Sequence, residues 1–270
     1  MMLGMSQNVH QGLVTQNGSY RSIKVSAPLH HWISCFWQLD VEQGSYVYRS
    51  VADNCVDWIT NLFDPAESFV VSPFTAPVEF PLCGPVSYFG IRFRILGYQG
   101  LTQLPLGEWS SASETIMAED IVMPELLERI QAISYKYNAS QFDQRCRSIS
   151  QVLLASLRYP VIDRRLMHFL NVVNNDTLLA PDAGKLKCIE FGSSHRHVRR
   201  LSQVYLGLSM KNFLRVARFQ KLLHQMQLNN SNMCSWSDYY FDQSHFIREF
   251  KYFTGTTPSH FRNMSFLYNP

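Results

Sequence analysis

Residues 242–262 read DQSHFIREFKYFTGTTPSHFR, in which a polar residue precedes a helical run, a glycine and the start of another helix. Four residues of this stretch have identical counterparts 48 positions earlier, where His197, Arg200, Gly207 and Phe213 correspond to His245, Arg248, Gly255 and Phe261. A unit that occurs twice within about a hundred residues indicates two copies of one supersecondary structure. The spacing predicts tandem helix-turn-helix units, each presenting one recognition helix to the major groove of DNA.

The first copy is predicted to begin with a supporting helix, LKCIEFG at 186–192, and to turn at Gly192. Ser194 suits the N-cap of the next helix, which we place at about residues 194–204. The 3.6-residue period turns Val198 and Leu201 inward. It leaves three arginines to project elsewhere, namely Arg196, Arg199 and Arg200. Arginine forms two parallel hydrogen bonds with guanine, so arginines at the start of such a helix indicate base contacts.

In the second copy Asp242 is the expected N-cap of a helix that reads QSHFIREFKYF. Phe246 and Phe250 are predicted to pack inward. The residues left to face DNA are Gln243, Ser244 and Arg248, of which glutamine suits adenine and arginine suits guanine. Gly255 is expected to end the helix, and Pro258 to begin the next one.

Between the copies, MKNFLRVARFQKLLHQMQL at 210–228 predicts one amphipathic helix. A helix of about 19 residues spans about 28 Å. This approaches the separation of about 34 Å between major-groove faces one helical turn apart. We therefore expect a stiff connector that places both recognition helices on one face of DNA. Its residues Arg215 and Arg218 either touch phosphate or, as the more favoured interpretation, solvate the helix.

The charge of the chain is divided unevenly. Residues 161–270 hold 14 Lys and Arg against 7 Asp and Glu, whereas residues 1–160 hold 10 against 14. A basic C-terminal half gains affinity for phosphate by releasing counterions. The six cysteines lack CxxC spacing, and no secretory signal or bilayer-spanning apolar run is present. These features predict a cytoplasmic protein without a membrane segment, a metal site or a disulfide framework.

Residues from Tyr20 to about Trp109 are rich in aromatic and β-branched side chains, and strands are expected at 32–41, 46–51, 55–63, 68–72 and 88–96. Turns are expected at Gly44, Asp64-Pro65, Pro73, Pro81 and Gly84-Pro85. Helical spacing follows after Pro105, and Tyr159-Pro160 marks the expected domain boundary. The predicted fold is α+β. Residues 1–160 form a β-rich barrel or sandwich with trailing helices, and residues 161–270 an all-α domain of two helix-turn-helix units.

Residues 163–262 resemble the DNA-binding domain of the AraC/XylS family of bacterial transcription regulators. The segment 242–262 matches that family's C-terminal signature, and LGLSMKNFLRVARFQKLL at 206–223 matches its connecting helix. By position, the resemblance places the base-facing residues at Arg196, Arg199, Arg200, Gln243, Ser244 and Arg248. The chain departs from the family pattern at Met210, within the connecting-helix segment, and at Ser235, Asp238 and Tyr239, before the C-terminal signature.

The N-terminal half resembles the β-rich sensor domain of one branch of the family in two motifs, SVADNCVDWI at 50–59 and FGIRFRILG at 89–97. The resemblance implies a domain that binds a small-molecule effector, forms a homodimer, or does both. Helices within 120–158 are the candidate dimer surface.

Several residues admit two interpretations. A metal at His195 and His197 is disfavoured because positions i and i+2 of a helix face different directions. Asp53 and Asp57 share one strand face like a catalytic pair, but nothing marks a nucleophile beside them. The aromatic residues Trp32, Phe36, Trp37, Trp58 and Phe93 line either a ligand pocket or, as favoured, a core. Candidates for phosphate contact are Ser194, Lys211 and Arg262, although the two basic residues equally serve solubility.

These observations predict a sequence-specific regulator of transcription, and the resemblance favours an activator. The expected partners are double-stranded promoter DNA and RNA polymerase, with a homodimer and an effector left open. No cofactor, metal or catalytic residue is expected. One rival interpretation is a small-molecule-processing β-barrel enzyme with a helical accessory domain. Another is a regulator that acts by protein contact only.

Overall fold

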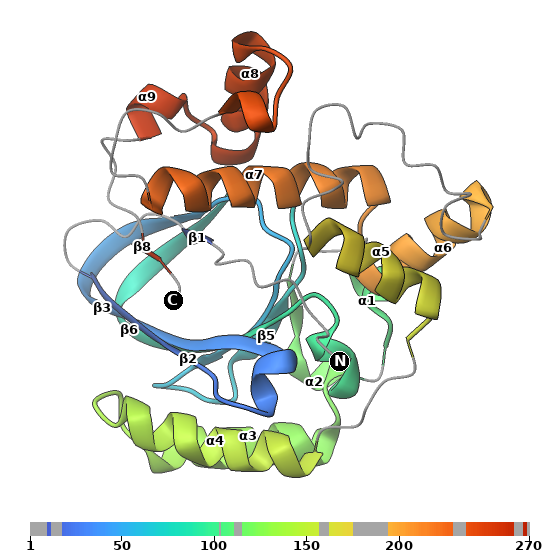
Figure 1. Ribbon diagram of the computed structural model, residues 1–270. Coiled ribbons are helices and arrows are strands. Elements are labelled where there is room, and N and C mark those ends of the chain that lie inside the picture. The colour runs from blue at the N-terminus through green and yellow to red at the C-terminus, as the bar shows by residue number, and fades with distance from the viewer. Residues whose placement is uncertain are drawn as a thin grey trace.

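The computed structural model describes residues 10–11, 18–102, 104–110, 115–156, 162–174, 194–228, 236–261 and 267–268. Its fold is α+β, as predicted. The N-terminal half contains a six-stranded antiparallel sheet in the order β2-β3-β6-β4-β5-β7, which leaves β2 and β7 at its edges. The strands are β2 (Gly18–Lys24), β3 (Ile33–Ser50), β4 (Val56–Asn61), β5 (Ser68–Val71), β6 (Val78–Phe93) and β7 (Thr115–Met117). The sheet is strongly curved (Figure 1). A separate antiparallel pair joins β1 (His10–Gln11) to β8 (Leu267–Tyr268).

The turns expected at Gly44, Pro81 and Gly84-Pro85 are wrong, because these residues lie inside two long paired strands. Gly44 has a φ of 127° and sits where the register between β3 and β6 shifts. Pro81 pairs with Val47 in a part of β6 that β4 does not reach, since β4 pairs only with residues 88–93. Proline has no N–H to donate, so it is tolerated where a strand has an open edge.

The two faces of the sheet are packed differently. On one face Phe36, Trp58 and Phe89 join a large buried cluster. Helices α3 (Pro124–Lys136) and α4 (Phe142–Ser156) contribute to that cluster from below. On the other face Trp37 and Leu39 belong to a smaller cluster. Successive side chains of a strand point to opposite faces, and this alternation separates Phe36 from Trp37.

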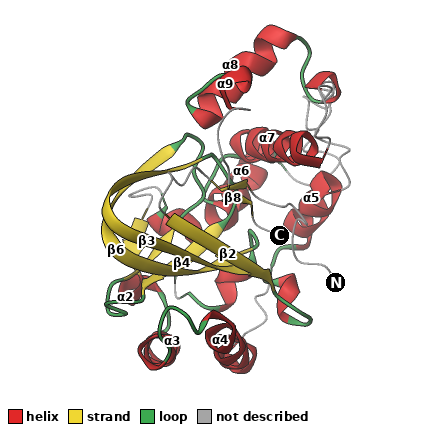
Figure 2. Ribbon diagram, turned by 90° about the vertical axis from the view of Figure 1, so that its left-hand side faces the viewer, coloured by secondary structure: helices red, strands yellow, loops and turns green. Residues whose placement is uncertain are grey.

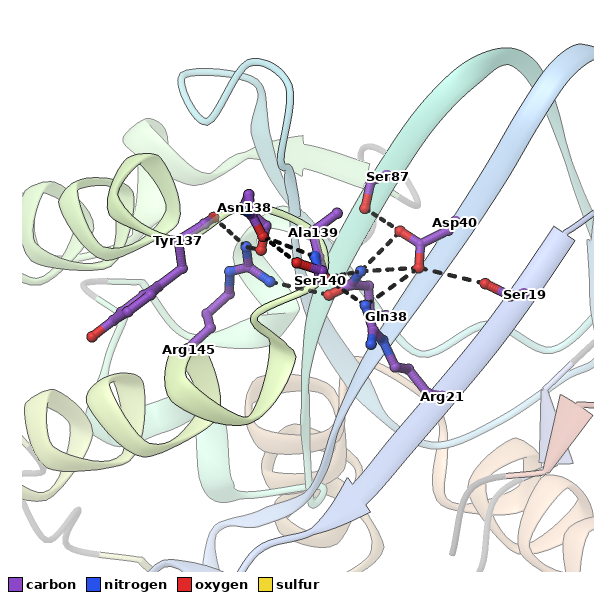
Figure 3. A network of polar contacts seen from close by, with 10 residues as sticks. All are labelled: Ser19, Arg21, Gln38, Asp40, Ser87, Tyr137, Asn138, Ala139, Ser140 and Arg145. Atoms are coloured by element: carbon purple, nitrogen blue, oxygen red, sulfur yellow. Dashed lines mark hydrogen bonds and ion pairs between the residues drawn. The ribbon is translucent and has the colours of Figure 1, made fainter.

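A polar network attaches the loop between α3 and α4 to strands β2 and β3 (Figure 3). The Arg145 guanidinium is buried and donates to Gln38 Oε1 at 3.0 Å. Gln38 Nε2 in turn donates to the carbonyl of Ala139 at 2.9 Å. Burial lowers the pKa of Arg145 to about 10. The network fixes the helical pair against the sheet by satisfying a buried cation with neutral acceptors.

The C-terminal helices are α5 (Arg164–Asn174), α6 (His195–Leu206), α7 (Met210–Leu228), α8 (Gln243–Thr254) and α9 (Pro258–Phe261), with a 3-10 turn at Trp236–Asp238. Short helices α1 (Leu106–Trp109) and α2 (Ala118–Ile121) follow the sheet. The sheet lies between the α3–α4 pair and helix α7 (Figures 1 and 2). The helical core also contains Val51, Ala52, Ile95 and Leu96 of the N-terminal half. The expected boundary at Tyr159-Pro160 lies outside the described residues, and the division into two domains there stays a prediction.

Candidate nucleic-acid interface

Helix α6 begins where the sequence predicted and continues to Leu206, two residues beyond the expected end at about 204. The Ser194 hydroxyl accepts the backbone N–H of His197 at 3.3 Å, which caps the first turn. Gly207 ends the helix with a φ of 65°, a conformation that glycine adopts without a steric penalty. Val198 and Leu201 are buried. The inward face is therefore fixed by packing, and the opposite face is left to solvent.

The three predicted base-facing arginines of α6 are all exposed. Arg196, Arg199 and Arg200 lie in its first two turns, and Arg200 Nη2 is 3.5 Å from His197 Nδ1. The sequence reasoning missed Asp163, whose Oδ2 lies 3.6 Å from His197 Nε2. The hydrogen bond from the Arg165 guanidinium holds the pKa of Asp163 well below its usual range. The Asp163 carboxylate therefore lies beside the first turn of α6.

Helix α8 repeats the arrangement of α6. Asp242 Oδ1 accepts the backbone N–H of His245 at 2.7 Å, and Gly255 ends the helix with a φ of 74°. Phe246 and Phe250 are buried, and α9 begins at Pro258. The predicted caps, inward face and helix boundaries of the second unit are all confirmed.

The outward face of α8 forms a shallow hollow. Gln243, Ser244 and Arg248 are exposed, as predicted. Ser244 and Arg248 line the hollow together with Ile247, Lys251 and Tyr252. Ile247 and Lys251 were missed by the sequence reasoning, although each follows a predicted residue, Ser244 or Arg248, by three positions and so lies on the same helix face.

Helix α7 connects the two units and spans Met210–Leu228, as predicted. Its residue Arg215 corrects both sequence interpretations, because Nε donates to Glu249 Oε1 of α8 at 2.6 Å. The same guanidinium lies 5.1 Å from the ring centre of Tyr252. Arg218 lies 5.8 Å from the ring centre of Tyr240. Both arginines therefore hold the second unit against the connector.

The supporting helices are described only in part. The expected helix at 186–192 lies outside the described residues, as does Arg262. In the second unit, the ring of Trp236 stacks on Phe246 at 6.1 Å with an interplanar angle of 2°. Tyr240 is buried and packs edge-on against His245 at 5.3 Å. Aromatic contacts thus connect the turn before α8 to its inner face.

Two of the three candidates for phosphate contact, Lys211 and Ser194, are among the described residues. Lys211 is exposed in the first turn of α7, and the Ser194 side chain serves as a cap. Among the described residues, no group of three or more His, Cys, Asp or Glu is arranged to hold a metal ion. The described helices include none that is long and apolar enough to span a membrane.

Asp53 and Asp57 form a buried ion cluster rather than a catalytic pair. Arg92 Nε donates to Asp57 Oδ1 at 3.0 Å, and Arg92 Nη1 lies 3.3 Å from Asp53 Oδ2. Burial raises the pKa of Asp53 to about 6, and the charge of Arg92 opposes that shift. Of the five aromatic residues weighed as pocket or core, Trp37 lines a cavity of about 200 Å³. The others are core residues, as favoured.

Two family models match the chain. Residues 188–264 match a model described as a helix-turn-helix domain. Residues 21–114 match a model described as a domain of unknown function, DUF6597. A search of curated proteins found no match.

Solved structures of ToxT from Vibrio cholerae are similar over most of the chain. An apo variant from strain SCE256 is 10% identical with a TM-score of 0.42, covering 94% of this chain and 96% of that chain. The O395 protein bound to (E)-4-(8-methylnaphthalen-1-yl)but-3-enoic acid is 11% identical with a TM-score of 0.41, covering 91% and 98%. Wild-type ToxT bound to an unsaturated fatty acid is 10% identical with a TM-score of 0.40, covering 98% of both chains.

Proposed function

We propose that helices α6 and α8 enter successive major grooves of one promoter, since the chain is a DNA-binding transcription regulator whose residues 188–264 match a helix-turn-helix domain model. One observation carries the proposal. The two helices have 12 residues each, the same pattern of polar N-cap and glycine C-cap, and an exposed arginine at equivalent positions, Arg200 and Arg248. A single helix of 19 residues, α7, joins them.

The proposed base contacts come from the first turns of each recognition helix. In α6 they are made by Arg196, Arg199 and Arg200, and in α8 by Gln243, Ser244 and Arg248. Exposure of all six side chains supports this assignment. Arginine addresses guanine and glutamine addresses adenine through paired hydrogen bonds. The two units are therefore expected to read different half-sites.

Contacts with phosphate set the register. We assign this role to Lys211 at the start of α7, to Ser194 beside the first recognition helix and to Arg262 after the second. Removing Lys211 is expected to weaken binding to every DNA sequence similarly, and to reduce the salt slope by about one. The surplus of basic residues in 161–270 supports a sequence-independent component of binding.

The protein is further proposed to act in the cytoplasm as an activator that contacts RNA polymerase through exposed faces of the C-terminal helices. The N-terminal half would sense an effector, form a homodimer through the helices within 120–158, or do both. Residues of the N-terminal half contact helices α6, α7 and α8. These contacts support a regulatory role, because they connect the N-terminal half to both recognition helices and to their connector.

The test begins with chromatin immunoprecipitation and sequencing, which yields candidate promoter fragments. Fluorescence anisotropy then measures the Kd for these fragments and for random DNA between about 50 and 200 mM salt. The expected results are a steep loss of affinity with salt and at least about a thousandfold preference for the specific site. Absence of both would refute the proposal and favour a regulator that acts by protein contact only.

The enzyme alternative gains no support from the carboxylates, since Asp53 and Asp57 are both engaged by Arg92. The double variant Arg200→Ala/Arg248→Ala tests the assignment of the recognition helices, because it should lose the preference for promoter DNA over random DNA. Both side chains are exposed, so their removal leaves the fold intact. A variant that kept the full preference for the promoter would contradict the assignment of the two helices.

A further inference from the structure

A cavity of about 200 Å³ opens on the face of the sheet opposite helices α3 and α4. Its walls include the rings of Tyr20, Trp37, Tyr48, Phe69, Phe80 and Tyr88. Trp37 lies flat against the neighbouring strand because Gly90 has no side chain, and a Cβ there would be 1.9 Å from the indole. Since an apolar cavity of about 150 Å³ admits benzene, this one has room for one aromatic ring with a short substituent.

The charge of the walls selects among such molecules. The lining residues include the carboxylates of Asp57 and Glu67 but no lysine, arginine or histidine among the described residues. Burial raises the pKa of both Tyr20 and Tyr48, so their hydroxyls are neutral at neutral pH. A carboxylate ligand would lose its hydration without gaining a cationic partner. An uncharged molecule avoids that cost, and a cation is attracted by the aromatic faces.

The floor of the cavity is connected to a buried charge cluster. Trp37 Nε1 donates to Asp57 Oδ1 at 2.9 Å. Asp57 is held by Arg92, which also pairs with Asp53. Asp53 and Arg92 are almost completely inaccessible to solvent. A buried cation cannot leave one of its carboxylates without a large cost, so these three side chains are expected to move together.

Asp53 belongs to a segment that holds the DNA-binding helices. Its neighbour Ala52 donates its N–H to the carbonyl of Phe253 in α8 at 3.2 Å. The Ala52 carbonyl accepts a hydrogen bond from Gln220 of α7. Asn54 Nδ2 donates to the carbonyl of Phe213, also in α7, at 3.0 Å. Residues 51–54 therefore contact both the connector and the end of the second recognition helix.

We propose that a small, largely apolar molecule, uncharged or cationic, binds in this cavity, and that the Asp57–Arg92–Asp53 cluster transmits its occupancy through residues 51–54 to helices α7 and α8. A ligand that packs on the indole of Trp37 alters the hydrogen bond to Asp57, and the cluster passes the change to Asp53. The effect requires that the ligand bind more tightly to one arrangement of α8 than to another. The inference rests on the proposed function only where DNA binding is its readout.

The class of ligand is tested with three probes that share one ring and differ in charge, namely 2-phenylethylamine, 2-phenylethanol and phenylacetate. Thermal unfolding of the full chain measures their binding. The amine and the alcohol are expected to raise the melting temperature, and phenylacetate is not. The variant Leu82→Trp fills the cavity from its half-buried wall and should abolish the rise. A wild-type protein stabilised equally by phenylacetate, or by none of the three, overturns the assignment.

Transmission is tested by hydrogen exchange and by DNA affinity in the presence of saturating 2-phenylethylamine. In the wild type, amide exchange should change in 51–54 and 250–254, and the Kd for promoter DNA should shift about fivefold or more. Asn54→Ala removes the bond to α7 and leaves the cavity walls intact, so it should keep the thermal shift and lose both responses. Asn138→Ala, in the loop between α3 and α4, is the matched control and should respond like the wild type.

Exchange that is unchanged in both segments of the saturated wild type overturns the transmission, whatever the DNA result. A full response in Asn54→Ala overturns the assigned route. If the chain binds no promoter DNA at all, the proposed function fails, but the thermal and exchange measurements still decide this inference.

Discussion

The two helix-turn-helix units, called the first head (around helix α6) and the second head (around helix α8), have the same helix caps but different neighbours. Helix α6 presents three exposed arginines and is capped by a serine at 3.3 Å. Helix α8 presents one exposed arginine over a shallow hollow, and is capped by an aspartate at 2.7 Å. Its inner face is held by aromatic rings and by the ion pair from α7. The first head is thus richer in charge, and the second is held by aromatic packing and by an ion pair.

The largest expected effect comes from the aromatic packing of the second head. The Phe250 ring is fully buried and lies against Phe219, Phe246 and Phe261. Phe250→Ala should lower the free energy of unfolding by about 3–5 kcal/mol. Urea denaturation measures the change. Ile247→Ala on the same helix is the control and should cost within about 0.5 kcal/mol, because that side chain is 38% exposed. Equal losses would mean that the inner face does not carry the stability.

A second comparison concerns DNA. Arg200→Ala and Arg248→Ala should each weaken binding to the specific site by about 1–3 kcal/mol, with a smaller effect on random DNA. Because the basic cluster is denser on α6, Arg199→Ala and Arg200→Ala should cost more than Gln243→Ala. Anisotropy titrations against both DNAs measure the difference. Equal weakening on both would show that the arginines touch phosphate only, and a footprint confined to the second half-site would reverse the ranking.

The ion pair between α7 and α8 gives a smaller effect that is specific to the second head. Arg215→Ala removes the partner of Glu249, whose side chain is only 9% exposed, and should cost about 1–2 kcal/mol of stability. Lys211→Ala, on the exposed start of the same helix, should leave stability unchanged. Thermal unfolding of the two variants decides the matter. A stable Arg215→Ala protein would mean that the stacked rings alone hold α8 in place.

The smallest effects are expected at the caps. Asp242→Ala and Ser194→Ala each remove one acceptor from a first turn, which typically costs about 1 kcal/mol. The aspartate accepts the shorter hydrogen bond and its charge complements the helix N-terminus, so it should be the costlier loss. Paired denaturation curves test the order. A larger loss of stability in Ser194→Ala than in Asp242→Ala would mean that the length of the capping hydrogen bond does not determine its contribution.

The sequence predicts the two heads and their connector well because their signals are local. Ser194 and Asp242 mark helix starts, Gly207 and Gly255 mark helix ends, and the period of the apolar residues gives the inner faces. The role of Arg215 was not predictable in this way, because its partner Glu249 lies 34 positions away. The same holds for Arg92, to which the pairing of β4 with β6 brings Asp57.

Part of the sheet was mispredicted for a related reason. Pro81 and Gly84-Pro85 have strong local turn propensity, yet the pairing of β3 with β6 continues past them. A Cβ at Gly84 would be 1.6 Å from the carbonyl oxygen of Glu42, so that glycine serves close strand approach instead of a turn. Local propensity therefore failed where distant strands determine the conformation.

One glycine outside the helix-turn-helix units sets how closely helix α6 packs on the N-terminal half. Gly107 of α1 lies so close to the last turn of α6 that a Cβ would be 2.1 Å from the carbonyl oxygen of Gln203. A single methyl group at that position would force α6 outward, because neither backbone can yield without breaking its own hydrogen bonds. Gly107→Ala is therefore expected to displace helix α6 and, with it, the three arginines that we propose to face DNA.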